Sequence, residues 1–252
     1  MRMLFRTCIV TLLSMAGSAF AGTIVVGANN GGNCDPFSCP GLGGGIETEY
    51  QQVYASSQFP GTFVIDSIDF FQAMAGASDA ATYQISFSIT GQAVGGLSTT
   101  LSNNIGVNSQ VFGTFTISSS PASLLTFTGT PYTYDPSEGN LLMDVVITGE
   151  SGPGTASWDE READSSGAVT SRAYSGTFSE ADTEGLVTQF DGSSVPEPSS
   201  FQFVTLVMIG LAVAAGKSVL RGTCYPKCIS PVWINTLESR FCQSGLSQES
   251  RR

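Results

Sequence analysis

Short stretches in which apolar and polar residues alternate constrain the fold of this chain more than any other feature. The clearest is Thr82–Thr90, where Tyr83, Ile85, Phe87 and Ile89 occupy every second position. Such alternation places apolar side chains on one face of a β-strand and polar side chains on the other. The polar face is expected to be solvent-exposed and consists of Gln84, Ser86, Ser88 and Thr90.

Similar strand-like stretches recur along the chain and are separated by turn-forming sequences rich in Gly, Pro, Asn and Asp. The predicted strands cover residues 22–27, 47–56, 61–71, 81–90, 110–118, 123–129 and 140–149, with two more near 168–174 and 186–190. No helical periodicity lies between them, so an all-β fold is expected, as an antiparallel β-sandwich or jelly roll. We expect one domain over residues 22–192, followed by a polar linker that begins after Asp191.

The chain contains no histidine. Histidine is the usual general acid or base near neutral pH and the commonest metal ligand. Its absence excludes Ser-His-Asp and Cys-His mechanisms. We therefore expect no catalytic residues, no cofactor and no metal site.

The first 21 residues have the pattern of a secretory signal peptide. Arg2 and Arg6 form a basic start, an apolar stretch follows over residues 7–15, and Ala19 and Ala21 supply the small residues that precede a cleavage site. The alternatives are a buried N-terminal helix or a membrane span, but the apolar stretch is shorter than a bilayer requires. A signal helix cleaved after Ala21 is the prediction.

Charge is distributed unevenly along the rest of the chain. Residues 22–195 contain 18 acidic residues against only Arg161 and Arg172, a net charge of −16. Nucleic acid is excluded as a partner, because its binding depends on Lys and Arg that neutralise phosphates. Residues 217–252 carry six cations and two acidic residues, a net charge of +4, which is typical of a cytoplasmic end.

Cys34 and Cys39 flank a short turn within a glycine-rich segment. Export would place them in an oxidising compartment, so a disulfide that closes a small surface loop is predicted. Two thiols without His or further Cys make no zinc site.

The densest cluster of charge is residues 157–166. Two functional interpretations are calcium binding through Asp159, Glu160, Glu162 and Asp164, or the carboxylate pair of a glycosidase. The spacing of a calcium loop is absent. A solvated turn or strand edge is the favoured interpretation.

An uncharged segment runs from Pro198 to Gly216. As a helix it would be roughly 28 Å long, about the thickness of a bilayer core, so one transmembrane helix is predicted. Lys217 and Arg221 follow as a basic stop that keeps this end in the cytoplasm. The alternative is a buried core helix.

Directly before this segment the chain reads Val195, Pro196, Glu197 and Pro198. The order of Pro-Glu-Pro, apolar segment and basic stop over residues 193–221 resembles the sorting signal of PEP-CTERM proteins, which bacterial exosortases recognise. The resemblance implies export, anchoring by the C-terminal helix, an exosortase as partner, and processing that leaves the domain at the cell surface or in extracellular polymer. Family members usually end soon after the basic cluster, whereas this chain continues as an atypical cytoplasmic tail, residues 222–252.

These features are compatible with three functions. The first is a non-enzymatic surface protein that serves adhesion or exopolysaccharide association, and the second is a secreted carbohydrate-active enzyme that pairs Asp66 or Asp69 with another acid. The third is a single-pass membrane protein that is never processed. Four tyrosines could stack on sugars, although a place in the core is favoured: Tyr50, Tyr54, Tyr132 and Tyr134.

Overall fold

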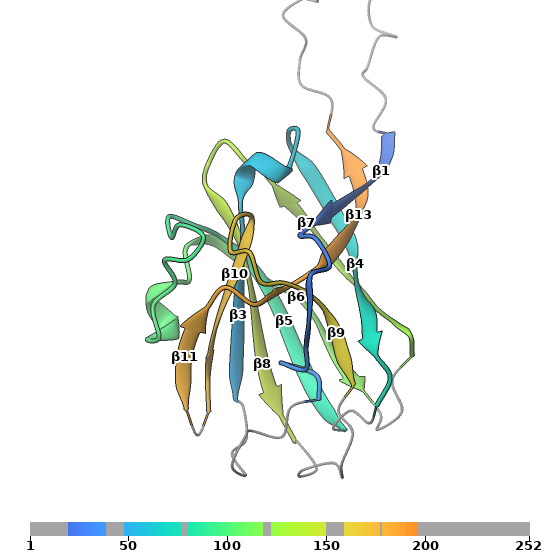
Figure 1. Cartoon of the computed structure of the whole chain (residues 1–252). Helices are drawn as coiled ribbons and strands as arrows, with labels where there is room; N and C mark the ends of the chain where they lie inside the picture. The colour runs from blue at the N-terminus through green and yellow to red at the C-terminus, as the bar shows by residue number, and fades with distance from the viewer. Residues whose placement is uncertain are drawn as a thin grey trace, which may run out of the picture. The chain divides into compact units, whose positions relative to one another are not determined.

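The computed structural model describes residues 20–38, 48–76, 80–117, 122–149, 159–176 and 178–195. Within these residues the chain is all-β, with thirteen strands, two 3-10 helices and no α-helix. The strands form two antiparallel sheets that share one hydrophobic core, an arrangement consistent with a β-sandwich (Figure 1). The predicted transmembrane helix lies outside the described residues, as does the signal peptide up to Ala19.

The first sheet is built around β4 (Phe63–Met74). On one side β4 pairs with β13 (Thr188–Ser194), which pairs in turn with β1 (Phe20–Val26). On the other side β4 pairs with β7 (Leu124–Tyr134). Three short strands extend this sheet beyond the start of β13: β9 (Glu160–Asp164), β12 (Gly185–Leu186) and β2 (Gly31–Asn33).

The second sheet has six strands, and all of its neighbours are antiparallel. Across the sheet they are β11 (Ser179–Asp182), β10 (Thr170–Ser175), β3 (Glu49–Tyr54), β8 (Asn140–Thr148), β5 (Ala81–Thr90) and β6 (Val107–Ile117). Consecutive strands of the chain often lie in opposite sheets, as β3, β4 and β5 do, so the two sheets are held together by many crossings.

Every predicted strand overlaps an observed one, and the prediction for residues 81–90 matches β5 at both ends. The predicted linker after Asp191 is wrong. Gly192, Ser193 and Ser194 belong to β13 and pair with β4 on one side and β1 on the other. Polar residues with small side chains fit a strand here because both neighbouring strands supply hydrogen-bond partners for the backbone.

The apolar face of β5 is buried as predicted, but its polar face is only partly exposed. Ser88 and Thr90 are buried, because the segment after β5 folds back over them. Thr90 donates a hydrogen bond to the carbonyl oxygen of Asn104, and Ser88 accepts one from the amide of Gly106. Residues 91–106 therefore cover part of the second sheet's outer face.

The covering segment includes the 3-10 helix η2 (Leu101–Asn103) and has its own small hydrophobic cluster. Leu97 and Leu101 pack there against Val53, Leu142 and Ala173 of the sheet. The main core between the sheets is rich in aromatic rings. Phe37 illustrates this, since its ring lies 5.2–5.6 Å from the rings of Phe70, Tyr83 and Phe127.

Candidate functional site

The two ends of the described chain meet at one end of the first sheet. β1 begins and β13 ends there, side by side (Figure 1). The register pairs Phe20 with Ser194 and Ala21 with Ser193. The predicted signal-cleavage position, Ala21, therefore lies in a paired strand, opposite Ser193, which is two residues before Val195 of the predicted sorting motif.

The folded domain continues up to the predicted sorting motif. The amide of Val195, the first residue of that motif, donates a 2.9 Å hydrogen bond to the carbonyl oxygen of Thr62. Its side chain is 41% exposed. No flexible spacer therefore separates the sheet from the Pro-Glu-Pro sequence.

The other predicted site residues of the two signals lie outside the described residues: Ala19, Pro196, Glu197, Pro198, Lys217 and Arg221. Cys34 is disulfide-bonded. Cys39 also lies outside the described residues, so its pairing with Cys34 stays a prediction.

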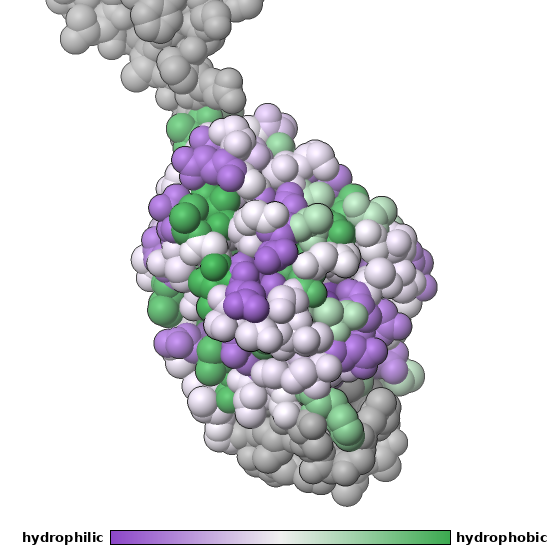
Figure 2. Space-filling model, turned by 90° about the vertical axis from the view of Figure 1, so that its left-hand side faces the viewer, coloured by the Kyte–Doolittle hydropathy of each residue, from purple (hydrophilic) through white to green (hydrophobic). Residues whose placement is uncertain are grey.

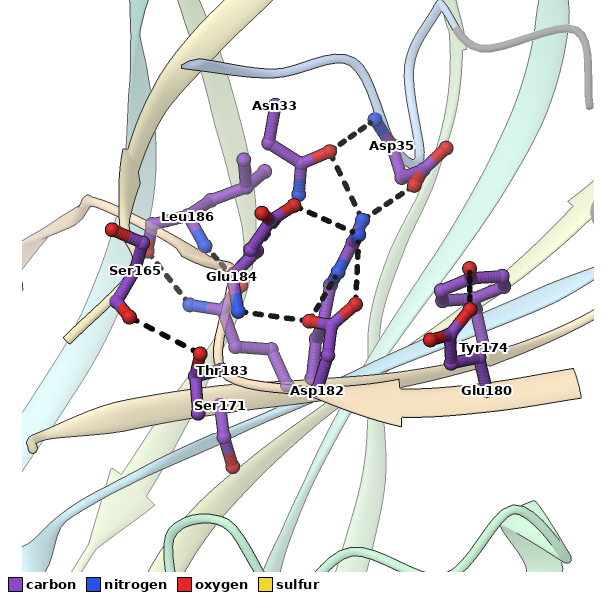
Figure 3. Close-up of polar contacts among 12 residues, drawn as sticks. Asn33, Asp35, Ser165, Ser171, Tyr174, Glu180, Asp182, Thr183, Glu184 and Leu186 are labelled. Atoms are coloured by element: carbon purple, nitrogen blue, oxygen red, sulfur yellow. Dashed lines mark hydrogen bonds and ion pairs between the residues drawn. The ribbon is translucent and has the colours of Figure 1, made fainter. Parts of the chain in front are cut away.

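Arg172 of β10 makes several hydrogen bonds to side chains from other parts of the chain. Figure 3 shows Asn33, Asp35, Asp182 and Glu184 gathered in this polar network. The guanidinium of Arg172 forms ion pairs with Asp35 and with both carboxylate oxygens of Asp182, at 2.9 and 3.0 Å for the latter. Asn33 and Glu184 complete the contacts. Burial alone would lower the pKa of Arg172, but the hydrogen bonds from Arg172 to Asp182 and the charge of Asp35 outweigh it and raise the pKa.

Arg161 of β9 is completely buried and forms an ion pair with Asp159, whose side chain is also buried. The interpretation of residues 157–166 as a solvated turn or strand edge is therefore wrong for this buried pair. The same guanidinium donates to the carbonyl oxygen of Ala122, and Gln72 donates to Asp159. These contacts balance the charge of Arg161 in β9 with that of Asp159, the residue directly before the strand, although Nε of Arg161 is buried without a hydrogen-bond partner among the described residues.

The calcium and glycosidase interpretations of this segment are also not favoured by the geometry. Asp159 is taken up by Arg161 and Gln72. Asp164 is buried and accepts hydrogen bonds from the amides of Ala28 and Ser166. Both carboxylates thus have internal partners.

The networks around Arg161 and Arg172 include every Lys and Arg in the described part of the chain. Only Arg161 and Arg172 occur there, and both are buried. On the face in Figure 2, hydrophilic and hydrophobic residues are interspersed in small groups. The ionised groups that reach solvent from the described residues are therefore carboxylates alone.

A pair of carboxylates lies on the outer face of the first sheet. Asp69 of β4 is buried, and Asp191 of β13 is half-buried beside it. The side-chain amide of Gln189 donates to both carboxylates, at 3.0 and 2.8 Å. Burial raises the pKa of Asp69, and the neighbouring charge of Asp191 adds to this. Burial would also raise the pKa of Asp191, but hydrogen bonds from Thr23 and Gln189 lower it.

A second pair with the same design lies on the outer face of the second sheet. The amide of Gln51 donates to Glu49 at 3.2 Å and to Asp144 at 2.8 Å. Burial and the charge of Asp144 raise the pKa of Glu49 to about 7. Gln51 itself is held by Asn104, which donates to its carbonyl oxygen at 2.8 Å.

Asp66 and Asp69 were predicted as candidate carboxylates, whereas Gln189 and Asp191 were not. The Gln-x-Asp spacing in β13 puts both side chains on one face, and that alternation was the available signal. Asp66 is exposed and does not join the pair. The four tyrosines considered for sugar stacking are all buried, so that interpretation is wrong: Tyr50, Tyr54, Tyr132 and Tyr134.

Within the described ranges, no group of three or more Cys, Asp and Glu side chains is arranged to hold a metal ion. The same part of the chain has no helix that is long and apolar enough to cross a membrane. Comparison with protein-family models, with curated proteins and with solved structures finds no match to this chain.

Proposed function

We propose that this chain is an exported, non-enzymatic surface protein that an exosortase sorts through its PEP-CTERM-like signal. The observation that supports this most is the hydrogen bond from Val195 to Thr62, which brings the folded sheet up to the sorting motif. Pro196 and Glu197 alone then separate the sheet from the apolar segment, and two extended residues span at most about 7 Å. A motif this close to the apolar segment would be accessible only to an enzyme at the membrane surface or within the bilayer.

We place the domain among the jelly rolls. The main strands of the first sheet run in the order β1, β13, β4, β7, and those of the second in the order β3, β8, β5, β6. This interleaving of the chain between two four-stranded sheets is the pattern expected for two Greek keys folded on each other. Lectin domains and capsid proteins both use this fold, so it is compatible with polysaccharide binding without indicating it.

The negative charge of the domain limits which classes of polysaccharide it could bind. Because neither Arg161 nor Arg172 reaches solvent, no cation of the described residues is available for an acidic polysaccharide. Neutral or amino-sugar polymers fit this surface better. A pull-down of the full chain with neutral, acidic and amino-sugar polysaccharides tests this, and preferential binding to acidic polymers without divalent cations would contradict it.

Sorting itself is tested by fractionating cells with and without the exosortase. We expect the mature protein to lose the mass of its C-terminal segment and to leave the membrane only in cells that contain the enzyme. An unchanged mass and location in both strains would contradict sorting and would favour the unprocessed single-pass protein.

A carbohydrate-active enzyme that uses paired carboxylates is the second candidate, since Asp69 does pair with Asp191. One Gln189 amide nitrogen lies within hydrogen-bond distance of both carboxylates. Retaining glycosidases hold their two carboxyl groups about 5 Å apart around the scissile bond, and that space is filled here by Gln189. Turnover of a polysaccharide by the purified chain, abolished by Asp69→Asn, would nevertheless favour the enzyme.

A further inference from the structure

A band of oxygen-bearing side chains crosses four strands on the outer face of the first sheet. Residues two apart on a strand share a face, and strand register aligns these residues in two neighbouring rows. The first row is Thr23, Asp191, Ser67 and Thr128, and the second is Gln189, Asp69 and Thr126. No Lys or Arg contributes to the band.

One buried oxygen in this band has no hydrogen-bond partner among the described residues. Asp69 is 6% exposed, and its Oδ2 accepts a hydrogen bond from Gln189. Its Oδ1 is buried and has no partner within hydrogen-bonding geometry among the described residues. A buried carboxylate oxygen without a partner is unfavourable, and a second carboxylate beside it adds repulsion. Either a proton or a cation is needed to balance this pair, and both arginines of the domain are engaged elsewhere.

The two acid–Gln–acid pairs differ in how their glutamine is held. In the second sheet Asn104 donates to the carbonyl oxygen of Gln51, which fixes the direction of that amide. Among the described residues none donates to the carbonyl oxygen of Gln189. The Gln189 amide can therefore turn, and a half-turn would exchange its two donated hydrogen bonds for a carbonyl oxygen pointing at the carboxylates.

We propose that Asp69 and Asp191 bind a single Ca²⁺ on the outer face of the first sheet, with Thr23 and the carbonyl oxygen of Gln189 as further ligands. The donors are all oxygens, as Ca²⁺ prefers. Thr23 is exposed and Asp191 is half-buried, so an ion can enter from solvent. The strongly acidic domain raises the local cation concentration around the site. In the ion-free state the Gln189 amide bridges the two carboxylates in place of the cation.

The test uses the full chain in detergent after treatment with a chelator. CaCl₂ is titrated by calorimetry, and thermal unfolding is followed with and without 10 mM CaCl₂, a concentration about tenfold above a weak extracellular site's Kd of about 1 mM. We expect one site and a shift of the unfolding equilibrium of about tenfold toward the folded state. Asp191→Asn should remove both effects. Asp144→Asn, in the pair whose glutamine is fixed, should keep them.

A third variant keeps the proposal testable if Asp191→Asn does not fold, which near-UV circular dichroism would detect. Gln189→Glu adds a third carboxylate without removing a ligand, so it should tighten Ca²⁺ binding several-fold. Absence of both heat and thermal shift in the unmodified chain would overturn the proposal, as would binding that survives Asp191→Asn. Loss of Ca²⁺ binding in Asp144→Asn, with binding unchanged in Gln189→Glu, would also overturn it, because the ion would then lie on the second sheet.

Discussion

At the residue scale, Arg161 and Arg172, the two cations among the described residues, are both buried in a part of the chain that is otherwise strongly acidic. The burial of Arg161 and Arg172 could not be predicted from the sequence. The partners of Arg172 include Asn33 and Asp35, more than 130 positions away. Only the fold brings such residues together, and no local pattern around Arg172 indicates that it is enclosed by acids.

Replacing Arg172 by Leu should lower the free energy of unfolding by about 3 kcal/mol, because Asp35 and Asp182 would remain without their cation. Urea denaturation measures the change. The matched control is Glu184→Gln, in the same network, where the carboxylate is 52% exposed and the expected loss is about 0–1 kcal/mol. An equal decrease in the free energy of unfolding in the two variants would contradict the expectation that the buried ion pairs of Arg172 contribute most of the network's stability.

Glu49 makes stability depend on pH. Its pKa is raised from 4.5 to about 7 in the folded chain, mainly by burial, so the folded state holds this proton more tightly than the unfolded state. The stability that the protonated group contributes is thus present below pH 4.5 and is lost as the pH rises from 4.5 to 7. Glu49→Gln keeps a neutral side chain at every pH, so its urea midpoint should exceed that of the unmodified chain more at pH 8 than at pH 4.5.

The control for this variant is Glu138→Gln, an exposed glutamate in the turn after β7. Its midpoint should differ from the unmodified chain by a similar amount at both pH values. If Glu49→Gln behaves in the same way, burial beside Asp144 does not hold the proton of Glu49.

At the element scale, alternation was enough to predict the long strands, because each buries one apolar face. β9 was not among the predicted strands because Glu160–Asp164 has no such pattern. Its Arg161 pairs with the nearby Asp159, but it also donates to the carbonyl oxygen of Ala122, which is distant in sequence. The end of β13 was mistaken for a linker for a related reason. Gly192 and the two serines after it look like a linker by composition, yet both of their neighbouring strands pair with them.

Gly192 should tolerate no larger residue. A Cβ there would lie 1.8 Å from the carbonyl oxygen of Val64, at the irregularity where β13 shifts its register against β4. Gly192→Ala should therefore cost about 1–3 kcal/mol and speed amide hydrogen exchange at Val195, which the same strand positions. Gly22 is its direct partner on β1, and a Cβ at Gly22 would meet only the Phe63 ring at 3.5 Å. Gly22→Ala should leave both measurements nearly unchanged, and an equal effect in the two would contradict the steric argument.

At the scale of the whole molecule, pairing of β1 with β13 brings the predicted signal-cleavage position and the predicted sorting motif to the same end of the first sheet. Phe20 and Ala21 would be removed with the signal peptide, so β1 of the mature chain would begin at Gly22, opposite Gly192. The signal peptide and the sorting motif could each be predicted from the local sequence. Their proximity depends on the order of the strands, which could not be predicted. The closeness of the sheet to the motif then limits how an enzyme can approach.

That limit gives a prediction for processing, and it rests on the proposed sorting by an exosortase. The amide of Val195 is hydrogen-bonded to Thr62, so an enzyme that cleaves near the motif must bind it directly beside the folded sheet. Inserting six Gly/Ser residues between Val195 and Pro196 should speed release of the domain in a pulse-chase experiment with the exosortase present. The same insertion after Ser137, in the exposed turn that follows β7, is the control for length and should leave the rate unchanged. If the domain is released at the same rate from the unmodified chain and from both insertion variants, the sheet does not restrict access of the enzyme. If the insertion after Val195 slows release, the enzyme uses the end of the sheet as part of its recognition surface.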